Sequence, residues 1–323
     1  MRYVIYGAGA VGGVIGGRLH ASGAEVVLIA RGRHLEAVQA DGLRLLTPDG
    51  EERHDVAAVA TPGALDLTDD DVVLLTVKGQ DTVTALDALT AAAPPGIAVV
   101  CAQNGVANER SALRRFANVY GMTVWLPAVF VTPGTVVQHA APIAGSLDVG
   151  RYPAGVDDRA ARTSADLQDA GFASRPDPAI MAAKYRKLLS NLGNALDAMC
   201  DGGFQSPLFG AAQAEAEAVL AAAGIDVRPR DEAAVAHVQI REVPGHEWAG
   251  SSSRQSFARG TGTVEVDFLN GEIVLLGRLH GVPTPVNELL QREARAAARA
   301  GLGPGAVRLS DLEARLPRPS SGG

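Results

Sequence analysis

The first residues whose types and spacing suggest ligand binding lie near the N-terminus, where a glycine-rich segment follows a short apolar run. This segment, GAGAVG, consists of Gly7, Ala8, Gly9, Ala10, Val11 and Gly12. The first glycine permits a tight turn, the second lets the backbone approach a pyrophosphate, and the third allows close packing of helix on strand. The positive N-terminal end of the following helix also attracts phosphate. The segment therefore predicts dinucleotide binding.

The residue after the second apolar run bears on the choice of dinucleotide. Glu25–Ala30 ends directly before Arg31, and Arg33 follows. An acidic residue at this point would accept hydrogen bonds from the ribose hydroxyls and repel a 2′-phosphate, whereas a guanidinium binds phosphate. Arg31 therefore favours NADP(H), and so NADPH as the cofactor, over NAD(H). Arg33 is explained equally well as a solvated surface residue.

Two further polar segments each follow an apolar run, VKGQDT at 77–82 and QNGV at 103–106. Cofactor and substrate groups gather outside the carboxyl ends of parallel strands. Lys78 could contact a phosphate or ribose of the cofactor, and Asn104 could bind near the nicotinamide. Alternatively, Lys78 is a solvated strand-end residue and Asn104 begins a simple turn. The residues alone leave both interpretations open.

A third group of polar residues lies in KYRKLLSNLGN, at 184–194. On a helix, Lys187, Asn191 and Asn194 have the spacing i, i+4 and i+7, which places them on one face. Two asparagines and a glycine are poor helix formers, so stability alone does not explain them. We interpret the row as facing a ligand cleft; a solvated polar face is the alternative.

The elements that must position these residues follow an alternating pattern. Expected strands are Arg2–Tyr6, Glu25–Ala30, Asp71–Lys78 and Ile97–Ala102, and expected helices are Ala10–Ser22 and Asp81–Ala92. Strands that alternate with helices predict an α/β fold, here a Rossmann-type doubly wound sheet with helices on both faces. The strand signal at 122–140 and 145–150 is expected to extend this sheet with antiparallel strands.

The pattern changes near residue 176, where the segment 177–202 predicts one long helix and further helical segments continue to about residue 300. We therefore expect a dinucleotide-binding domain at 1–177, a mostly α-helical substrate domain at 178–314 and a disordered tail at 315–323. The junction between two such domains is a common place for a small-molecule site.

Composition excludes several classes of function. The 323 residues carry a net charge of −7, which argues against a nucleic-acid surface. No apolar run has the length of about 18 residues that a membrane-spanning helix needs, and no leader segment is recognised. We therefore expect a cytoplasmic protein without a membrane partner. The His and Cys residues lack the spacing of metal ligands, so no metal site is predicted. The apolar C-terminal helices are compatible with a homodimer.

Taken together, these motifs resemble those of the ketopantoate reductase (2-dehydropantoate 2-reductase) family along nearly the whole chain. The matching segments are GAGAVG, Arg31, VKGQDT, QNGV, KYRKLLSN and the stretch 251–290. The resemblance implies NADPH-dependent reduction of a small 2-oxo acid, ketopantoate, to pantoate in pantothenate biosynthesis. It also implies that the cofactor binds the first domain.

By the same resemblance, Lys187 is the catalytic lysine, Glu265 its acidic partner, and Asn191 and Ser252 bind substrate. Asn104 falls in the family's cofactor-contacting segment. Hydride delivery to a ketone develops charge on oxygen, which a lysine ammonium can stabilise and protonate. Lys184 is a competing lysine, but it lacks the spacing to Asn191, so its substitution is expected to have a mild effect.

The chain departs from the family pattern on the substrate side. Ala195 stands where the family usually has a second asparagine, Asn194 comes one residue early, and the run at 251–255 is altered. These departures keep two alternatives open. One is a related NADPH-dependent reductase that acts on another branched 2-oxo acid, and the other is a non-catalytic NADP-binding protein.

Overall fold

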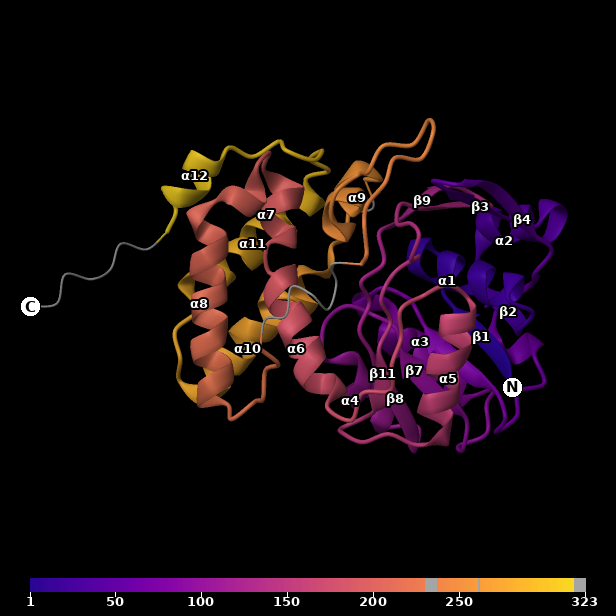
Figure 1. Cartoon of the computed structure of the whole chain (residues 1–323). Coiled ribbons are helices and arrows are strands. Elements are labelled where there is room, and N and C mark those ends of the chain that lie inside the picture. The colour runs from indigo at the N-terminus through magenta and orange to yellow at the C-terminus, as the bar shows by residue number, and fades with distance from the viewer. Residues whose placement is uncertain (230–236, 261, 317–323) are drawn as a thin grey trace, which may run out of the picture. The chain divides into compact units, whose positions relative to one another are not determined.

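The computed structural model describes residues 1–229, 237–260 and 262–316. The chain divides into two compact units, Met1–Lys184 with Pro229–Trp248, and Tyr185–Arg228 with Ala249–Gly323 (Figure 1). The first unit thus runs past residue 177 and includes a segment from later in the chain. From residue 317 onward, the tail expected from the sequence lies outside the described residues.

The first unit is built on a seven-stranded sheet that has the predicted doubly wound form. In spatial order its strands are β11 (Val149–Arg151), β8 (Asn118–Met122), β7 (Ala98–Cys101), β6 (Val72–Leu75), β1 (Arg2–Tyr6), β2 (Glu25–Ile29) and β5 (Ala57–Val59). All neighbours are parallel except β11, which runs antiparallel to β8. From β5 to β8 this is the strand order of a dinucleotide-binding fold, with the order reversing at β1.

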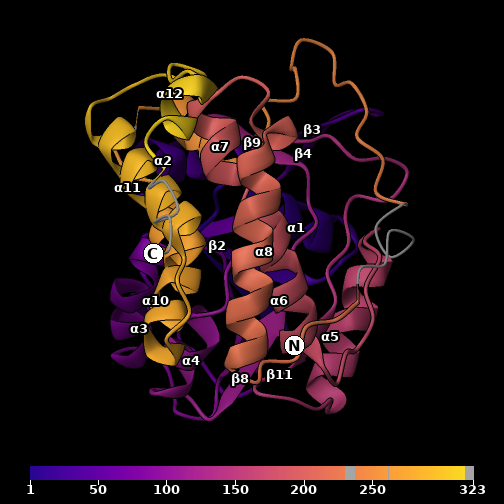
Figure 2. The ribbon, with the colours of Figure 1, turned by 90° about the vertical axis from the view of Figure 1, so that its left-hand side faces the viewer.

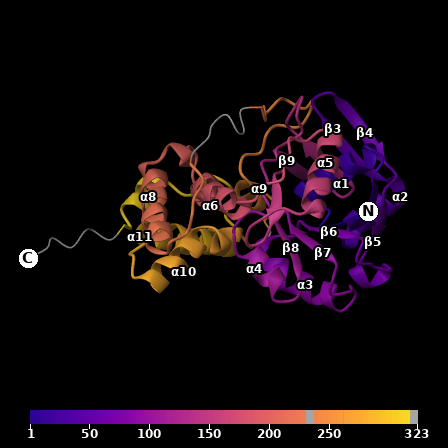
Figure 3. The same ribbon diagram turned by 60° about the horizontal axis from the view of Figure 1, so that its bottom comes forward.

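Helices cover both faces of this sheet, which explains why its strands are apolar throughout. Along β6, Val72 and Leu74 belong to one buried cluster, whereas Val73 and Leu75 belong to another, because successive side chains of a strand point to opposite faces. The first cluster includes α1 (Ala10–Ala21) and α5 (Asp158–Asp169); the second includes α3 (Thr82–Thr90) and α4 (Asn108–Leu113). Figure 3 shows the two pairs on opposite sides of the strands.

A second sheet corrects one expectation. The strands predicted within 122–140 do not extend the main sheet; only β11 does so. Instead β9 (Ala128–Thr132) and β10 (Thr135–Gln138) join β3 (Leu43–Thr47) and β4 (Gly50–His54), in the order β4-β3-β10-β9. Val136 of β10 packs against α1 at Gly13, where an added Cβ would lie 2.8 Å from its side chain. Strand propensity does not specify the pairing partner, and here tertiary packing on α1 decides it.

The second unit is helical, as predicted. Its helices are α6 (Ile180–Asn191, which begins in the first unit), α7 (Asn194–Met199), α8 (Pro207–Ala222), α9 (Ser252–Ala258), α10 (Asn270–His280), α11 (Pro285–Arg299) and α12 (Leu309–Glu313). Helices α8, α10 and α11 pack on one another (Figure 2). Among the described residues, no helix has the length and apolar character needed to cross a bilayer.

The expected long helix over 177–202 is interrupted. Helix α6 ends at Asn191 and α7 begins at Asn194. A Cβ on Gly193 would lie 2.6 Å from the ring of Phe204, so this close aromatic contact requires glycine at the break. Asn270 also donates a 3.2 Å hydrogen bond to the carbonyl oxygen of Leu192. The predicted single face is therefore wrong for Asn194, which belongs to the next helix.

Candidate active site

The glycine-rich turn joins β1 to α1, and its three glycines meet different steric constraints. Gly7 has a φ of 111°, and a Cβ on Gly12 would lie 2.3 Å from the carbonyl oxygen of Gly7. By contrast, a Cβ on Gly9 would meet no heavy atom of the described residues within 4 Å. No described side chain caps the start of α1. Gly7 and Gly12 are therefore needed by the fold itself, whereas Gly9 and the free N–H groups of α1 fit a phosphate ligand.

Arg31 directly precedes α2 (Gly32–Asp41), in the short connection after β2, and it is exposed. Burial raises the pKa of the Tyr6 phenol, and the Arg31 guanidinium partly opposes that shift. The backbone N–H groups of Gly7 and Ala8 donate to the carbonyl oxygen of Ile29 (3.1 and 3.2 Å), so the end of β2, two residues before Arg31, lies against the glycine-rich turn. The arginine therefore lies where a cofactor phosphate beside β2 could be bound.

His34 contacts the turn, although the sequence analysis did not single it out. Its Nδ1 accepts a 2.9 Å hydrogen bond from the backbone N–H of Gly134, so its Nε2 carries the proton and donates to the carbonyl oxygen of Ala8 at 2.6 Å. Burial lowers the pKa of the His34 imidazole, which favours this neutral form. The contact links the turn to the second sheet, a long-range relationship that no local motif signals.

A buried hydrogen-bond network joins the two polar segments that follow β6 and β7. The side-chain amide of Gln103 donates to the carbonyl oxygen of Val77 (2.7 Å) and to the hydroxyl of Thr82 (2.9 Å). Thr82 donates to Asn108 (2.9 Å), whose amide donates to the carbonyl oxygen of Asn104 (3.1 Å). Residue types alone did not reveal the roles of Gln103, Thr82 and Asn108.

Asn104 and Lys78 lie where strand-end residues were expected. Lys78 is half-buried at the residue before a short 3₁₀ turn, Gly79–Asp81. The side-chain Oδ1 of Asn104 is buried and accepts no hydrogen bond within the described part of the chain. Because a buried acceptor without a donor is costly, this oxygen fits an external N–H group, such as that of a carboxamide.

Lys184, the competing lysine of the sequence analysis, is buried. Its Nζ lies 2.6 Å from Oε1 of Glu109, and both side chains are almost completely inaccessible. Removing one member of such a pair leaves an uncompensated buried charge and costs about 3–5 kcal/mol. The expectation that substitution of Lys184 is mild must therefore be revised, since the sequence does not show the distant carboxylate that pairs with it.

In the second unit, Lys187 and Asn191 lie one helical turn apart on α6. Lys187 is half-buried, and Oδ1 of Asn191 is a buried acceptor with no hydrogen-bond donor among the described residues. Asn194 is buried at the first residue of α7. The amide of Asn191, like that of Asn104, thus has an acceptor available for a ligand.

The serine run and Glu265 begin two later elements of the second unit. Ser251 caps α9 by accepting a hydrogen bond from the N–H of Arg254 (3.2 Å), and its own N–H donates to Asp197 of α7 (2.9 Å). Ser251 is therefore committed to the fold, while Ser252 is half-buried at the first residue of α9. Glu265 is buried at the start of a 3₁₀ turn, Glu265–Phe268.

Asn270, another residue that the sequence analysis did not identify, forms hydrogen bonds that connect the end of α6 to the later helices of this unit. Its buried amide donates both to the carbonyl oxygen of Leu192, next to Asn191, and to Oδ1 of Asn287 (3.1 Å). Asn287 in turn donates to Glu215 of α8 (2.8 Å). These hydrogen bonds hold the end of α6 against α10, α11 and α8, and thereby fix the position of Asn191 within this unit.

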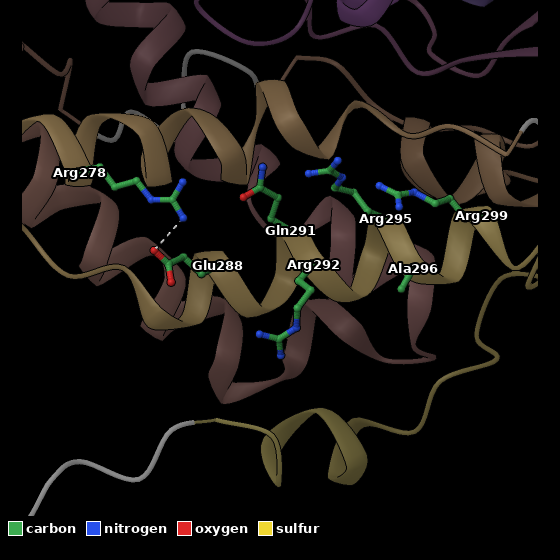
Figure 4. Close-up of a pocket in the computed structure, with 7 residues that line it drawn as sticks. All are labelled: Arg278, Glu288, Gln291, Arg292, Arg295, Ala296 and Arg299. Carbon is green, nitrogen blue, oxygen red and sulfur yellow. Dashed lines mark hydrogen bonds and ion pairs between the residues drawn. The ribbon is translucent and has the colours of Figure 1, made fainter.

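A separate pocket of about 430 Å³ lies on α10 and α11 (Figure 4). It is lined by Arg278, Glu288, Gln291, Arg292, Arg295, Ala296 and Arg299. Three of its four arginines pair with carboxylates of the same unit at 3.0–3.6 Å. Most of its positive charge is thus compensated, and none of the residues predicted to bind ligands lines it.

The strand order and the open glycine turn of the first unit define a dinucleotide-binding protein. Comparison with known proteins specifies the family. The family model "Ketopantoate reductase PanE/ApbA" matches residues 3–154, and "Ketopantoate reductase PanE/ApbA C terminal" matches residues 179–298. The chain belongs to the ketopantoate reductase family, as its sequence motifs indicated. It is an oxidoreductase, and membership of this family points to a nicotinamide cofactor.

Relatives support the assignment over almost the full length. A 2-dehydropantoate 2-reductase of Halobacterium salinarum is 32% identical over 319 residues, covering 93% of this chain and 100% of that protein. A crystal structure of a PanE/ApbA family ketopantoate reductase from Ralstonia eutropha JMP134 is 32% identical, with a TM-score of 0.77 and coverage of 93% and 99%. D-mandelate dehydrogenase, solved with NADH and anilino(oxo)acetate, has the same TM-score and coverage at 22% identity, a likeness of fold alone.

Proposed function

We propose that this protein catalyses the NADPH-dependent reduction of 2-dehydropantoate (ketopantoate) to pantoate, a step of pantothenate biosynthesis in the cytoplasm. The proposal rests on family membership together with one observation about helix α6. Of its two lysines, Lys184 is committed to a buried ion pair with Glu109, whereas Lys187 lies one turn before Asn191. This difference favours Lys187 as the lysine that serves the substrate.

The cofactor is proposed to bind the first unit. The glycine-rich turn and the start of α1 would hold the pyrophosphate, and Arg31 would bind the 2′-phosphate of NADPH. Lys78 would contact the ribose or a phosphate, and Oδ1 of Asn104, a buried acceptor, would bind the carboxamide of the nicotinamide. When bound, NADPH supplies the hydride that is added to C2 of the ketone.

The residues of the second unit are proposed to handle the substrate and its proton. As the C2–H bond forms, the electron pair of the carbonyl moves onto oxygen, and the Lys187 ammonium stabilises and then protonates that oxygen. Glu265 would orient Lys187 and accept a hydrogen bond from the substrate hydroxyl. Asn191 would bind the same hydroxyl, and Ser252 and Asn194 would contact the rest of the substrate.

The alternative is a reductase of another branched 2-oxo acid, and the altered substrate-side residues favour keeping it. Ala195 cannot supply the amide that the family usually has there, and the serine run is changed. The test is a panel of 2-oxo acids, ketopantoate included, assayed by loss of NADPH absorbance. Ketopantoate should give the highest kcat/KM. A much higher value for an unrelated ketone or aldehyde would overturn the substrate assignment.

A further inference from the structure

The buried ammonium of Lys184 contacts more than its carboxylate partner. Besides the 2.6 Å contact with Glu109, its Nζ donates to the backbone carbonyl oxygens of Cys101 (3.3 Å), Gln103 (2.9 Å) and Met122 (3.2 Å). Cys101 and Met122 are the last residues of the neighbouring parallel strands β7 and β8. One lysine from α6 therefore ties two strand ends and the loop after β7 to a single point.

This buried ion pair contributes little net stability, but it fixes the positions of the two strand ends and the loop after β7. Burying two charges costs desolvation that their attraction barely offsets, and apolar side chains of similar size would often stabilise the fold as well. What apolar side chains would not do is direct three carbonyl groups toward one atom. The loop so held continues directly into Asn104, whose Oδ1 is buried and accepts no hydrogen bond among the described residues.

The strand order indicates which part of a dinucleotide this loop would serve. The glycine-rich turn follows β1, and Arg31 follows β2, on one side of it. The loop after β7 lies on the other side, two strands from β1, or about 10 Å at the usual strand spacing. A dinucleotide bound across the point where the strand order reverses has its adenosine half beside β2 and its nicotinamide half beside β6 and β7.

We propose that Lys184 and Glu109 are positioning residues that hold the nicotinamide side of the cofactor site without touching cofactor or substrate. This inference rests on the proposed function, because it assumes that the dinucleotide binds across β1. The proposal predicts different effects on the two halves of the dinucleotide. Loss of the buried ammonium should disturb the nicotinamide half and leave the adenosine half unaffected.

The experiment compares NADPH with 2′,5′-ADP, which carries only the adenosine side. In Lys184→Met, NADPH affinity should fall about 10-fold, the scale of losing hydrogen bonds from a charged group, and kcat should fall by about 10²-fold, as for a misplaced reacting group. Affinity for 2′,5′-ADP should change by less than about 2-fold, because the glycine-rich turn and Arg31 lie beyond the ammonium's contacts. Both affinities are measured by calorimetry on the full chain.

Two further variants keep the test decisive. Glu109→Leu/Lys184→Met removes both buried charges, so it should fold even where the single variant does not, and it should show the same selective loss. Arg2→Met breaks an ion pair with Asp71 at the opposite end of the same sheet (2.8 Å), so it should lower the melting temperature without changing the ratio of the two affinities.

Three outcomes would overturn the inference. In the first, the double variant binds NADPH and turns over like the wild type. In the second, both ligands weaken equally, which would reduce the pair to a structural role. In the third, the wild-type protein binds neither ligand, a result that would also remove the proposed function and is thereby distinguished from the first two.

Discussion

The side-chain amide of Gln103 donates a 2.7 Å hydrogen bond to the backbone carbonyl oxygen of Val77. This one contact joins the loop after β7 to the loop after β6, which the sequence shows only as two separate polar segments. Gln103 is buried, so the hydrogen bond is protected from water and leaving it unmade would be costly. The two loops therefore form one structural unit at the carboxyl edge of the sheet.

The hydroxyl of Thr82 provides a test of this unit, because it accepts from Gln103 and donates to Asn108. Thr82→Val keeps the shape of the side chain and removes both hydrogen bonds. We expect the free energy of unfolding to fall by about 1–3 kcal/mol and the KM for NADPH to rise. The measurements are urea denaturation and steady-state kinetics. Thr90→Val is the matched control, since Thr90 is an exposed residue whose hydroxyl donates to the carbonyl oxygen of Leu86 in the same helix. An equal effect there would contradict the prediction.

A substitution at Gly9 is expected to affect cofactor binding without affecting the stability of the fold. A Cβ at this position meets no described atom within 4 Å, and the residue has an ordinary φ of −73°. Gly9→Ala should therefore keep the wild-type melting temperature while NADPH binding is lost, because the methyl group occupies the space of the pyrophosphate. Fluorescence titration with NADPH measures the loss. Gly210→Ala, equally open but on α8, should retain both properties. Unchanged NADPH affinity in Gly9→Ala would remove the phosphate site from this turn.

Arg31 is expected to decide the preference between the two nicotinamide cofactors. Arg31→Ala should weaken NADPH binding by about 10- to 100-fold, the scale of charge-assisted hydrogen bonds to a phosphate. NADH binding should change little, because NADH lacks the 2′-phosphate. Calorimetric titration of each cofactor provides the comparison, with Arg33→Ala as the exposed neighbouring control. Equal losses of affinity for NADPH and NADH would refute the assignment.

Lys187 is expected to act in the chemical step rather than in cofactor binding. Lys187→Ala should lower kcat by about 10²-fold or more, the scale of losing a general acid, while NADPH affinity stays near the wild-type value. Glu265→Ala should lower kcat and raise KM for the 2-oxo acid together, because Glu265 is proposed to contact both substrate and lysine. Steady-state kinetics and NADPH fluorescence separate the two effects. A Lys187→Ala enzyme with normal kcat would remove the lysine from the mechanism.

The buried histidines predict how stability depends on pH. Burial lowers the pKa of His34, His54 and His139 below the ordinary value of 6.5. The unfolded chain therefore takes up these protons first as the pH falls. The stability due to the neutral imidazoles is complete above about pH 6.5 and decreases below it. The free energy of unfolding should therefore be lower at pH 5.5 than at pH 7.5.

Urea denaturation at the two pH values measures this difference. His139→Phe should reduce it, because the aromatic ring that packs edge-on against Trp248 is kept while the titrating group is removed. His280→Gln, on the exposed end of α10, should leave the difference unchanged. A wild-type protein that is equally stable at both pH values would contradict the prediction.

Local patterns in the sequence determined the dinucleotide-binding fold and most of its first half. Gly7, Gly9 and Gly12 occupy a strand-turn-helix context that is recognisable without a structure, because the positive φ at Gly7 and the close packing at Gly12 both require glycine. The continuous apolar runs of β1, β2, β6 and β7 predicted strands buried on both faces. The strand predicted at Asp71–Lys78 is shorter in the structure, Val72–Leu75, and in the loop that follows the carbonyl oxygen of Val77 accepts a hydrogen bond from Gln103.

Only the tertiary structure decided the relationships between residues far apart in the chain. The pairing of Lys184 with Glu109, the contact of His34 with Ala8 and the placement of β10 beside β3 each join segments that no local period relates. The break of the predicted long helix at Gly193 likewise depends on contact with the ring of Phe204, which lies beyond the end of that predicted helix. Local propensity fixes which elements form, but burial and the partners available for buried polar groups determine how those elements pair.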